Sequence, residues 1–184
     1  MNANRSAAAK KEGAKKAQAF SSLHTLGGLL YFCASADTAE GDIDVLVDTL
    51  AGVNADKKAV AWGKFLISCN DRSVCAVGHV PKELVSEKGL DAKEWAGRLM
   101  DTTTSFAGCC ARMVNDTLMG DEEFVKFIID VDPAAETFPF KLCDALVTCS
   151  TAVLKEKGLV AAPPSCPEDD DDEIDYSDAA GITW

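Results

Sequence analysis

The sequence lacks the short motifs that mark common catalytic and nucleotide-binding sites. It contains no G-x-S-x-G, no P-loop and no G-x-G-x-x-G pattern, which belong to hydrolase nucleophiles and phosphate-binding turns. Histidine occurs only at His24 and His79, which excludes a metal centre built on several histidines. We therefore expect a protein that is not an enzyme and that needs no cofactor.

Long hydrophobic runs are also missing. No apolar stretch approaches the roughly 20 residues of a transmembrane helix, and no apolar core follows the basic N-terminus as a secretion signal requires. These absences predict a cytoplasmic protein without membrane contact. A mitochondrial presequence stays open as the alternative, because residues 5–16 are basic and rich in alanine, although lysine dominates over arginine and Glu12 interrupts the segment.

The eight cysteines include no C-x-x-C pair, the spacing typical of zinc and redox sites. Most of them lie inside apolar runs, as Cys33 and Cys75 do. A free cysteine in such a place behaves as a small core residue, and without a secretion signal a reducing compartment is the default. We predict free thiols rather than a disulfide framework.

Negative charge dominates the chain, but unevenly. The net charge is −12 overall, made up of +4 in residues 1–16, −8 in residues 17–166 and −8 in residues 167–184. Attraction to phosphate comes from lysine and arginine. Any binding of nucleic acid must therefore be confined to local basic patches.

A length of 184 residues fits one domain with tails. Residues 1–19 form a basic, Ala/Lys-rich arm, either a helix or a solvated segment. Residues 20–162 form a single α/β domain. Residues 163–184 form an acidic tail that begins with Pro163-Pro164, and its mutual repulsion predicts disorder. Deleting residues 167–184 should leave the melting temperature nearly unchanged.

A β-hairpin is predicted at the centre of the domain. Two apolar runs, 59–69 and 74–80, flank Asn-Asp-Arg-Ser at 70–73, and these residue types favour a tight turn. Pro81 should end the second strand, because proline cannot donate to a strand ladder. Cys75 and His79 lie on this strand, about 13 Å apart and too far for a thiol–imidazole pair.

A helix should follow the hairpin and lie on its sheet. Asp91 is a predicted N-cap, with Glu94 reaching back to complete a capping box. Trp95 should face the sheet together with Leu90 and Leu99, and replacing Trp95 by alanine should cost about 3–5 kcal/mol.

Hydrophobic periodicity places the remaining elements. The order predicts an α/β (α+β) fold, in which helices pack on a small mixed sheet with a central hairpin. The expected elements are a strand at 29–34, helices at 43–50 and 106–118, a strand at 124–129 (a short helix from 121 is the alternative) and a helix at 142–153.

Two stretches resemble a known family. Val80-Pro-Lys-Glu-Leu84 and Lys88-Gly-Leu-Asp-Ala-Lys-Glu-Trp95 are similar to the V-P-K-x-L turn and the K-G-L-x-A-x-E-W helix start in the globular C-terminal domain of alanyl-tRNA synthetases. The resemblance covers residues 27–154. The family's glycine-rich stretch after this helix is missing, since residues 101–110 read DTTTSFAGCC. The resemblance implies a non-catalytic module, without aminoacylation or editing modules, that binds tRNA or dimerises.

Two hypotheses follow. In the first, local basic groups bind RNA, although the interleaved acids of the body make an ordinary solvated face the alternative interpretation. In the second, the chain is an acidic accessory subunit that keeps the fold without RNA binding and docks proteins through its arm or tail, with a homodimer possible. The candidate RNA contacts are Lys10, Lys11, Lys15 and Lys16 in the arm, together with Lys82, Lys88, Lys93 and Arg98 in the body.

Overall fold

The computed structural model describes residues 3–114 and 123–159. Within these ranges the chain forms one mixed five-stranded sheet and five α-helices. In chain order the elements are α1 (Ala3–Gly27), β1 (Tyr31–Ser35), α2 (Ile43–Asn54), the 3-10 helix η1 (Ala59–Ala61), β2 (Gly63–Cys69), β3 (Ser73–His79), α3 (Lys82–Lys88), α4 (Ala92–Thr102), the 3-10 helix η2 (Thr103–Ser105), β4 (Cys109–Met113), β5 (Phe124–Val131) and α5 (Pro139–Glu156).

The strand order of the sheet is β1-β2-β3-β5-β4. β1 runs parallel to β2, and every other neighbouring pair is antiparallel. A parallel pair needs a crossover connection, which α2 and η1 provide. The predicted hairpin is confirmed as β2 and β3. Its turn is closed by Asn70, whose Oδ1 accepts hydrogen bonds from the backbone N–H groups of Arg72 and Ser73.

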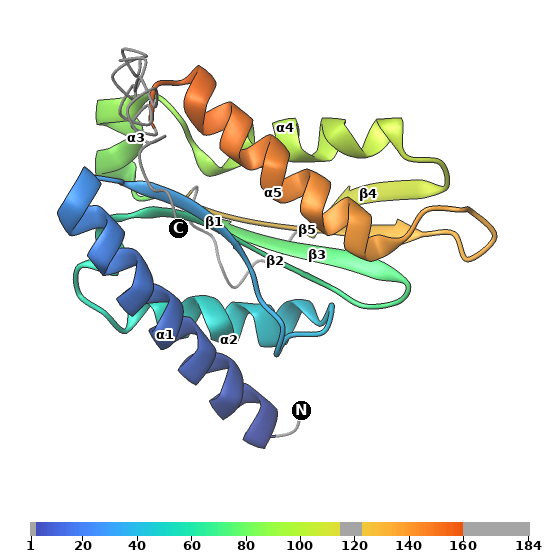
Figure 1. Cartoon of the computed structure of the whole chain (residues 1–184), viewed down its shortest axis with the longest axis horizontal. Coiled ribbons are helices and arrows are strands. Elements are labelled where there is room, and N and C mark those ends of the chain that lie inside the picture. Colours follow the sequence, from blue (N-terminus) through green and yellow to red (C-terminus); the bar gives the residue numbers. More distant parts are fainter. Residues whose placement is uncertain (1–2, 115–122, 160–184) are drawn as a thin grey trace, which may run out of the picture.

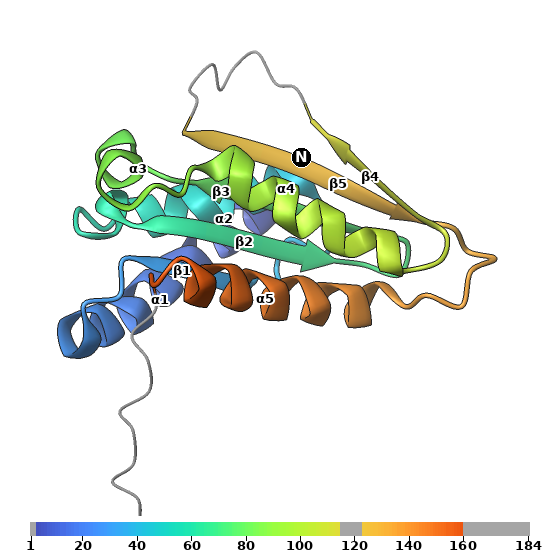
Figure 2. The ribbon, with the colours of Figure 1, turned by 90° about the horizontal axis from the view of Figure 1, so that it is seen from above.

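Helices cover both faces of the sheet (Figures 1 and 2). α4 and α5 lie on one face, and α1 and α2 lie on the other. Each face has its own buried core: Phe65 and Phe127 are fully buried on the α4–α5 side, and Leu66 and Val77 are fully buried on the α1–α2 side. The predicted fold class, helices packed on a small mixed sheet, is confirmed.

The basic arm is part of helix α1, which packs against α2. Ala9 and Ala17 are buried in this contact. Gly13 and Gly52 let the two backbones touch, since a Cβ on Gly13 would lie 2.0 Å from the Thr49 carbonyl oxygen. Of the two alternatives for residues 1–19, the structure has the helix, and α1 continues past residue 19 to Gly27.

The helix expected at 106–118 is wrong within the described residues. Cys109–Met113 forms strand β4 at the edge of the sheet. Cys109 and Ala111 pack against the core while Cys110 and Arg112 are exposed, an alternation typical of a strand. The end of the expected helix, including Leu118, lies outside the described residues.

Other local predictions agree with the structure. The strand preferred at 124–129 is β5, the helices at 43–50 and 142–153 are α2 and α5, and the strand at 29–34 is β1. Trp95, Leu90 and Leu99 are all 0 % exposed, so the predicted sheet-facing side of α4 is confirmed. The acidic tail, including Cys166, falls outside the described residues.

Candidate nucleic-acid interface

A sharp turn between α3 and α4 positions the lysines of the body. Pro81 precedes α3, which ends at Gly89 in the left-handed conformation with φ +70°. The Gly89 N–H bonds to the Val85 carbonyl, a helix ending that favours glycine. α4 then begins at once, because Asp91 Oδ1 accepts a hydrogen bond from the Glu94 N–H at 2.6 Å. The predicted N-cap is thereby confirmed.

A groove of about 390 Å³ lies beside this turn. Lys82, the first residue of α3, and Lys93, near the start of α4, both line it. Lys88 lies at the end of α3 between them in the sequence, and all three side chains are exposed. The fold therefore gathers three of the four predicted body cations at one corner. The remaining lining residues are Val80, Val85, Ser86, Asp91 and Glu123.

Arg98, the fourth predicted body cation, is engaged elsewhere. Its guanidinium contacts the carboxylate of Glu156 on α5, so it joins α4 to α5. Glu94 does not reach back as a capping-box residue would; instead it pairs with Lys157 at 2.6 Å. Lys88 and Lys93 form no ion pair with any residue in the described ranges.

The lysines of α1 divide into two pairs. Lys10 lies 3.4 Å from Asp48, and Lys16 lies 3.3 Å from Glu12. Lys11 and Lys15, four residues apart, are exposed and have no carboxylate partner among the described residues. Lys10 and Lys16 therefore form ion pairs within the fold, whereas Lys11 and Lys15 form none with the described residues.

Glu12 explains why the N-terminal half of α1 is fixed in place. Its carboxylate accepts hydrogen bonds from the backbone N–H groups of Asp37 and Thr38, each at 3.0 Å. Burial alone would raise the pKa of Glu12, but these hydrogen bonds and nearby Lys16 hold it below its usual value. Arg5 binds the same loop through the carbonyls of Thr38 and Ala39 and the carboxylate of Glu40.

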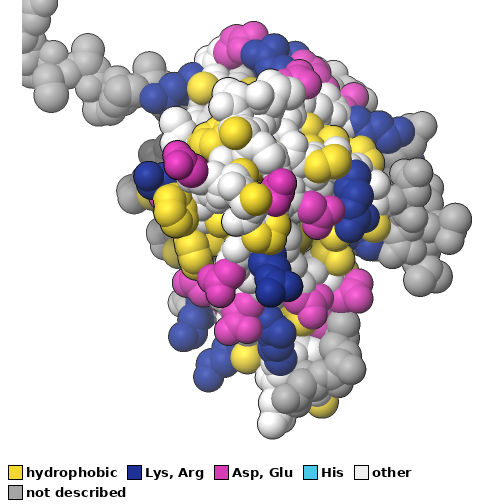
Figure 3. Space-filling view, turned by 90° about the vertical axis from the view of Figure 1, so that its right-hand side faces the viewer, with side chains coloured by type: hydrophobic (Ala, Val, Ile, Leu, Met, Phe, Trp, Pro, Cys, Tyr) yellow, Lys and Arg dark blue, Asp and Glu magenta, His cyan; other side chains and the backbone are white. Residues whose placement is uncertain are grey.

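Acidic groups are interleaved with the basic ones at the surface. Figure 3 shows the end of the molecule opposite the α3–α4 corner, where Lys and Arg side chains are mixed with Asp and Glu and form no broad patch of one sign. At the α3–α4 corner, Glu83, Glu87 and Asp91 are near neighbours of the lysines in sequence. A polyanion would therefore contact a few extended lysine side chains rather than a continuous surface of positive charge.

Sequence reasoning missed two cations near this corner. Lys157 follows the end of α5, and its ammonium lies 3.4 Å from the Gly89 carbonyl. Lys57 lines a second groove, of about 410 Å³, whose lining also includes Glu83 and Glu87 of α3. These lysines are far from residues 82–93 in sequence, so only the tertiary fold reveals them.

The histidine of β3 is buried in the fold. His79 is 4 % exposed, its ring lies 4.3 Å from that of Phe124, and its Nε2 lies 3.7 Å from the Glu123 carboxylate. Burial raises the pKa of the Cys75 thiol to about 12, which disfavours a thiolate nucleophile on this strand. No group of three or more metal-ligating side chains occurs in residues 3–114 and 123–159.

No helix in the part of the chain that the structure describes is long and apolar enough to cross a membrane. Comparison with known proteins adds no assignment: the sequence matches no protein-family model and no curated protein sequence.

Proposed function

We propose that this protein is a non-catalytic RNA-binding module that contacts tRNA through the α3–α4 corner. The observation that supports the proposal best is the position of Lys82 and Lys93, which come from two helices and line one groove, with Lys88 exposed beside them. The V-P-K-x-L and K-G-L-x-A-x-E-W stretches, on which the resemblance to alanyl-tRNA synthetases depends, form this same corner.

The charges predict modest affinity. Three lysines on a surface with interleaved carboxylates can form about three phosphate contacts, and each contact contributes about one unit to the dependence of log K on log salt. Side chains that contact phosphate groups fix the position of an RNA but do not read its sequence. We therefore expect binding that is clear at low salt, weak at physiological salt and tolerant of tRNA identity.

A filter-binding titration with total tRNA at two salt concentrations tests the proposal. The Lys88→Gln/Lys93→Gln variant should bind several-fold more weakly, and its salt slope should fall by about two units. The matched control is Arg72→Gln/Lys141→Gln, which removes the same charge at the opposite end of the sheet, at the hairpin turn and at the start of α5. The control should bind as the unmodified protein does.

Two results would refute RNA binding at this corner. One is the absence of tRNA retention at low salt. The other is an equal loss of affinity in both double variants, which would mean that only net charge matters. Circular dichroism should show that both variants are folded, because the four replaced side chains are exposed.

The second candidate function is an accessory subunit that binds another protein. It is favoured by Phe138 and Phe140, whose side chains are 62 % and 61 % exposed at the start of α5, since exposed aromatic residues are enriched at protein interfaces. A pull-down with the full chain and with a Phe138→Ser/Phe140→Ser variant tests it. A partner retained by both proteins would argue against this surface.

A further inference from the structure

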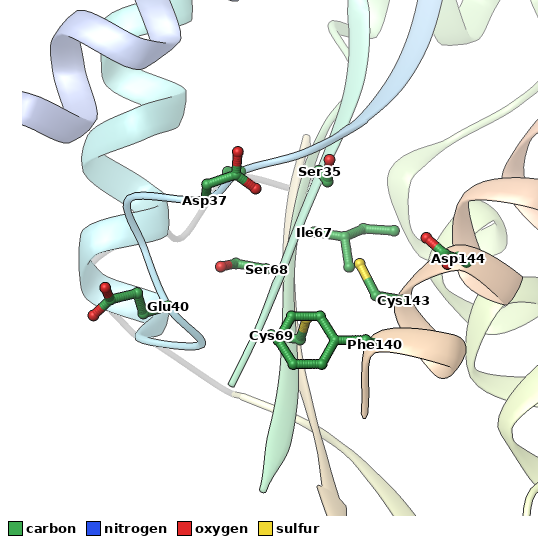
Figure 4. Close-up of a pocket in the computed structure, with 10 residues that line it drawn as sticks. Ser35, Asp37, Glu40, Ile67, Ser68, Cys69, Phe140, Cys143 and Asp144 are labelled. Carbon is green, nitrogen blue, oxygen red and sulfur yellow. The ribbon is translucent and has the colours of Figure 1, made fainter. Parts of the chain in front are cut away.

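A pocket opens at the end of the sheet opposite the α3–α4 corner. It has a volume of about 330 Å³, and Figure 4 shows it between β2, the loop after β1 and the first turns of α5. Asp37 lies on the loop side of the pocket and Asp144 on the α5 side, while Phe140 lies across the opening. Glu40 also lines the pocket, but its carboxylate pairs with Arg5. The pocket therefore has one carboxylate on each side of a largely apolar interior.

Two cysteines from different elements line this pocket. Cys69 is the last residue of β2 and Cys143 lies in the first turns of α5. Figure 4 shows the Cys143 sulfur directed from α5 toward the β2 side of the pocket, where Cys69 lies. Burial acts first on the pKa of both thiols, and each thiol then acts on the pKa of the other, in keeping with two side chains that line one cavity. Cys33 of β1 and Cys149 of α5 do not line the pocket.

We propose that Cys69 and Cys143 are a redox site, which hydrogen peroxide converts to an intramolecular disulfide. Cys69 is partly exposed whereas Cys143 is 6 % exposed, so Cys69 reacts first. Its thiolate attacks one peroxide oxygen, the O–O bond breaks, and the departing hydroxide takes a proton to leave as water. The resulting sulfenic acid is attacked by the Cys143 sulfur, the S–S bond forms and a second water leaves. The two sulfurs together lose two electrons, which the peroxide gains.

Burial and nearby carboxylates predict how this site behaves. Burial first, and then Cys69 and Asp144, raise the pKa of Cys143 to about 12, and burial also raises the pKa of Cys69. The thiolate fraction near neutral pH is therefore small, and oxidation should be slow. High-pKa thiols are also poor leaving groups, so the disulfide should resist glutathione and yield to a stronger dithiol reductant.

The disulfide would tie the start of α5 to the end of β2. It would join residues 74 positions apart in the sequence, a long loop whose closure restricts the unfolded chain. Phe140 and Asp144 lie on the same turns of α5. Oxidation would therefore fix the aromatic cover and one acidic wall of the pocket relative to the sheet.

Peptide mapping without reduction tests the proposal on the unmodified full chain. After peroxide treatment and blocking of free thiols, trypsin places Cys69 in peptide 65–72 and Cys143 in peptide 142–155. We expect these peptides to be linked. Because Cys149 shares the second peptide, the same experiment on a Cys149→Ala variant assigns the bond. The melting temperature should rise by roughly 5 °C or more on oxidation, and the rise should be lost in Cys69→Ser.

Three results would overturn the proposal. They are a bond from Cys69 to any cysteine other than Cys143, further oxidation of Cys69 to sulfinic acid without a bond, and no reaction under conditions that oxidise an exposed cysteine. Cys110 is exposed on β4, and loss of its alkylation by iodoacetamide after peroxide treatment shows that the conditions oxidise an exposed cysteine. Persistence of the 65–72/142–155 link in Cys149→Ala supports the proposal even if Cys143→Ser fails to fold.

Discussion

Trp95 donates a hydrogen bond from its indole Nε1 to the hydroxyl of Ser150, across a distance of 3.0 Å. The two residues belong to α4 and α5, and both are 0 % exposed. The Trp95 ring also lies 5.2 Å from that of Phe65 and 5.8 Å from that of Tyr31, centroid to centroid. One side chain thus joins both helices of this layer to the sheet and satisfies its only polar atom there.

Replacing either partner should lower stability by different amounts. Trp95→Ala should cost about 3–5 kcal/mol because it leaves a large cavity. Ser150→Ala should cost about 1–3 kcal/mol, because the buried indole N–H loses its acceptor. Urea unfolding of Trp95→Phe, of Ser150→Ala and of the double variant Trp95→Phe/Ser150→Ala forms a mutant cycle for the hydrogen bond. A Ser150→Ala variant as stable as the original chain would show that the indole N–H finds another acceptor.

Lys64 should make stability depend on pH. Its side chain is buried, and its ammonium donates hydrogen bonds to Asn54 Oδ1 and to the Ala59 carbonyl. Burial lowers the pKa of Lys64 to about 7. Between pH 7 and 10 the unfolded chain binds a proton here that the folded chain has lost, so stability rises with pH in this window.

Comparison with Lys64→Met isolates the effect of this group. The free energy of unfolding of the unmodified protein should rise by about 1–2 kcal/mol more than that of the variant between pH 6.5 and 8.5. Both histidines remain in the variant, so their titration cancels in the difference. Parallel pH profiles, measured by urea unfolding, would mean that Lys64 stays charged in the fold.

Replacing either of two helical glycines by alanine should change the stability of the protein in opposite directions. A Cβ on Gly52 of α2 would lie 2.1 Å from the Lys10 carbonyl oxygen of α1, whereas a Cβ on Gly97 of α4 meets nothing within 4 Å. Gly52→Ala should therefore destabilise by at least about 2 kcal/mol. Gly97→Ala should stabilise by about 0.5–1 kcal/mol through helix propensity. Thermal unfolding of both variants measures this, and equal effects would refute the close contact of α1 with α2.

The two lysine pairs of α1 should also differ in their effects. If α1 contributes to RNA binding, Lys11→Gln/Lys15→Gln should weaken tRNA retention and leave stability unchanged, because neither lysine pairs with a described carboxylate. Lys10→Gln/Lys16→Gln should instead lower stability slightly, by up to about 1 kcal/mol, since it removes two surface ion pairs. Filter binding and urea unfolding separate the outcomes. The reverse pattern would mean that the paired lysines leave their partners for RNA.

The sequence predicted correctly those elements whose defining residues lie close to one another in the chain. The turn residues Asn70–Ser73, the Asp91 cap and the helical spacing of Trp95 and Leu99 each depend on neighbours within about four positions, and the structure has all of them. The strand at Cys109–Met113 was missed because two of its residues, Cys110 and Met113, have the spacing of one helix face together with Phe106. Its pairing with β5 decides the conformation, and that partner lies about 20 residues away.

The candidate site was predictable in part. The sequence places Lys82, Lys88 and Lys93 near one another, and the fold keeps them at one corner. It could not show that Arg98 pairs with Glu156 or that Lys157 reaches the same corner, because 58 positions separate Arg98 from Glu156 and 68 separate Gly89 from Lys157. That Cys69 and Cys143 line one pocket was equally impossible to predict from the sequence, since 74 positions separate them.

The order of the strands has a consequence for how the chain folds. β2 and β3 are joined by a short turn, so their ladder closes a small loop and can form within microseconds. Every other ladder joins distant segments or requires a longer closure, for example Tyr31 with Gly63 and Ser73 with Asp130. Non-local pairing slows folding. The central hairpin is therefore the natural nucleus, and the remaining strands add to its two edges as the helices dock.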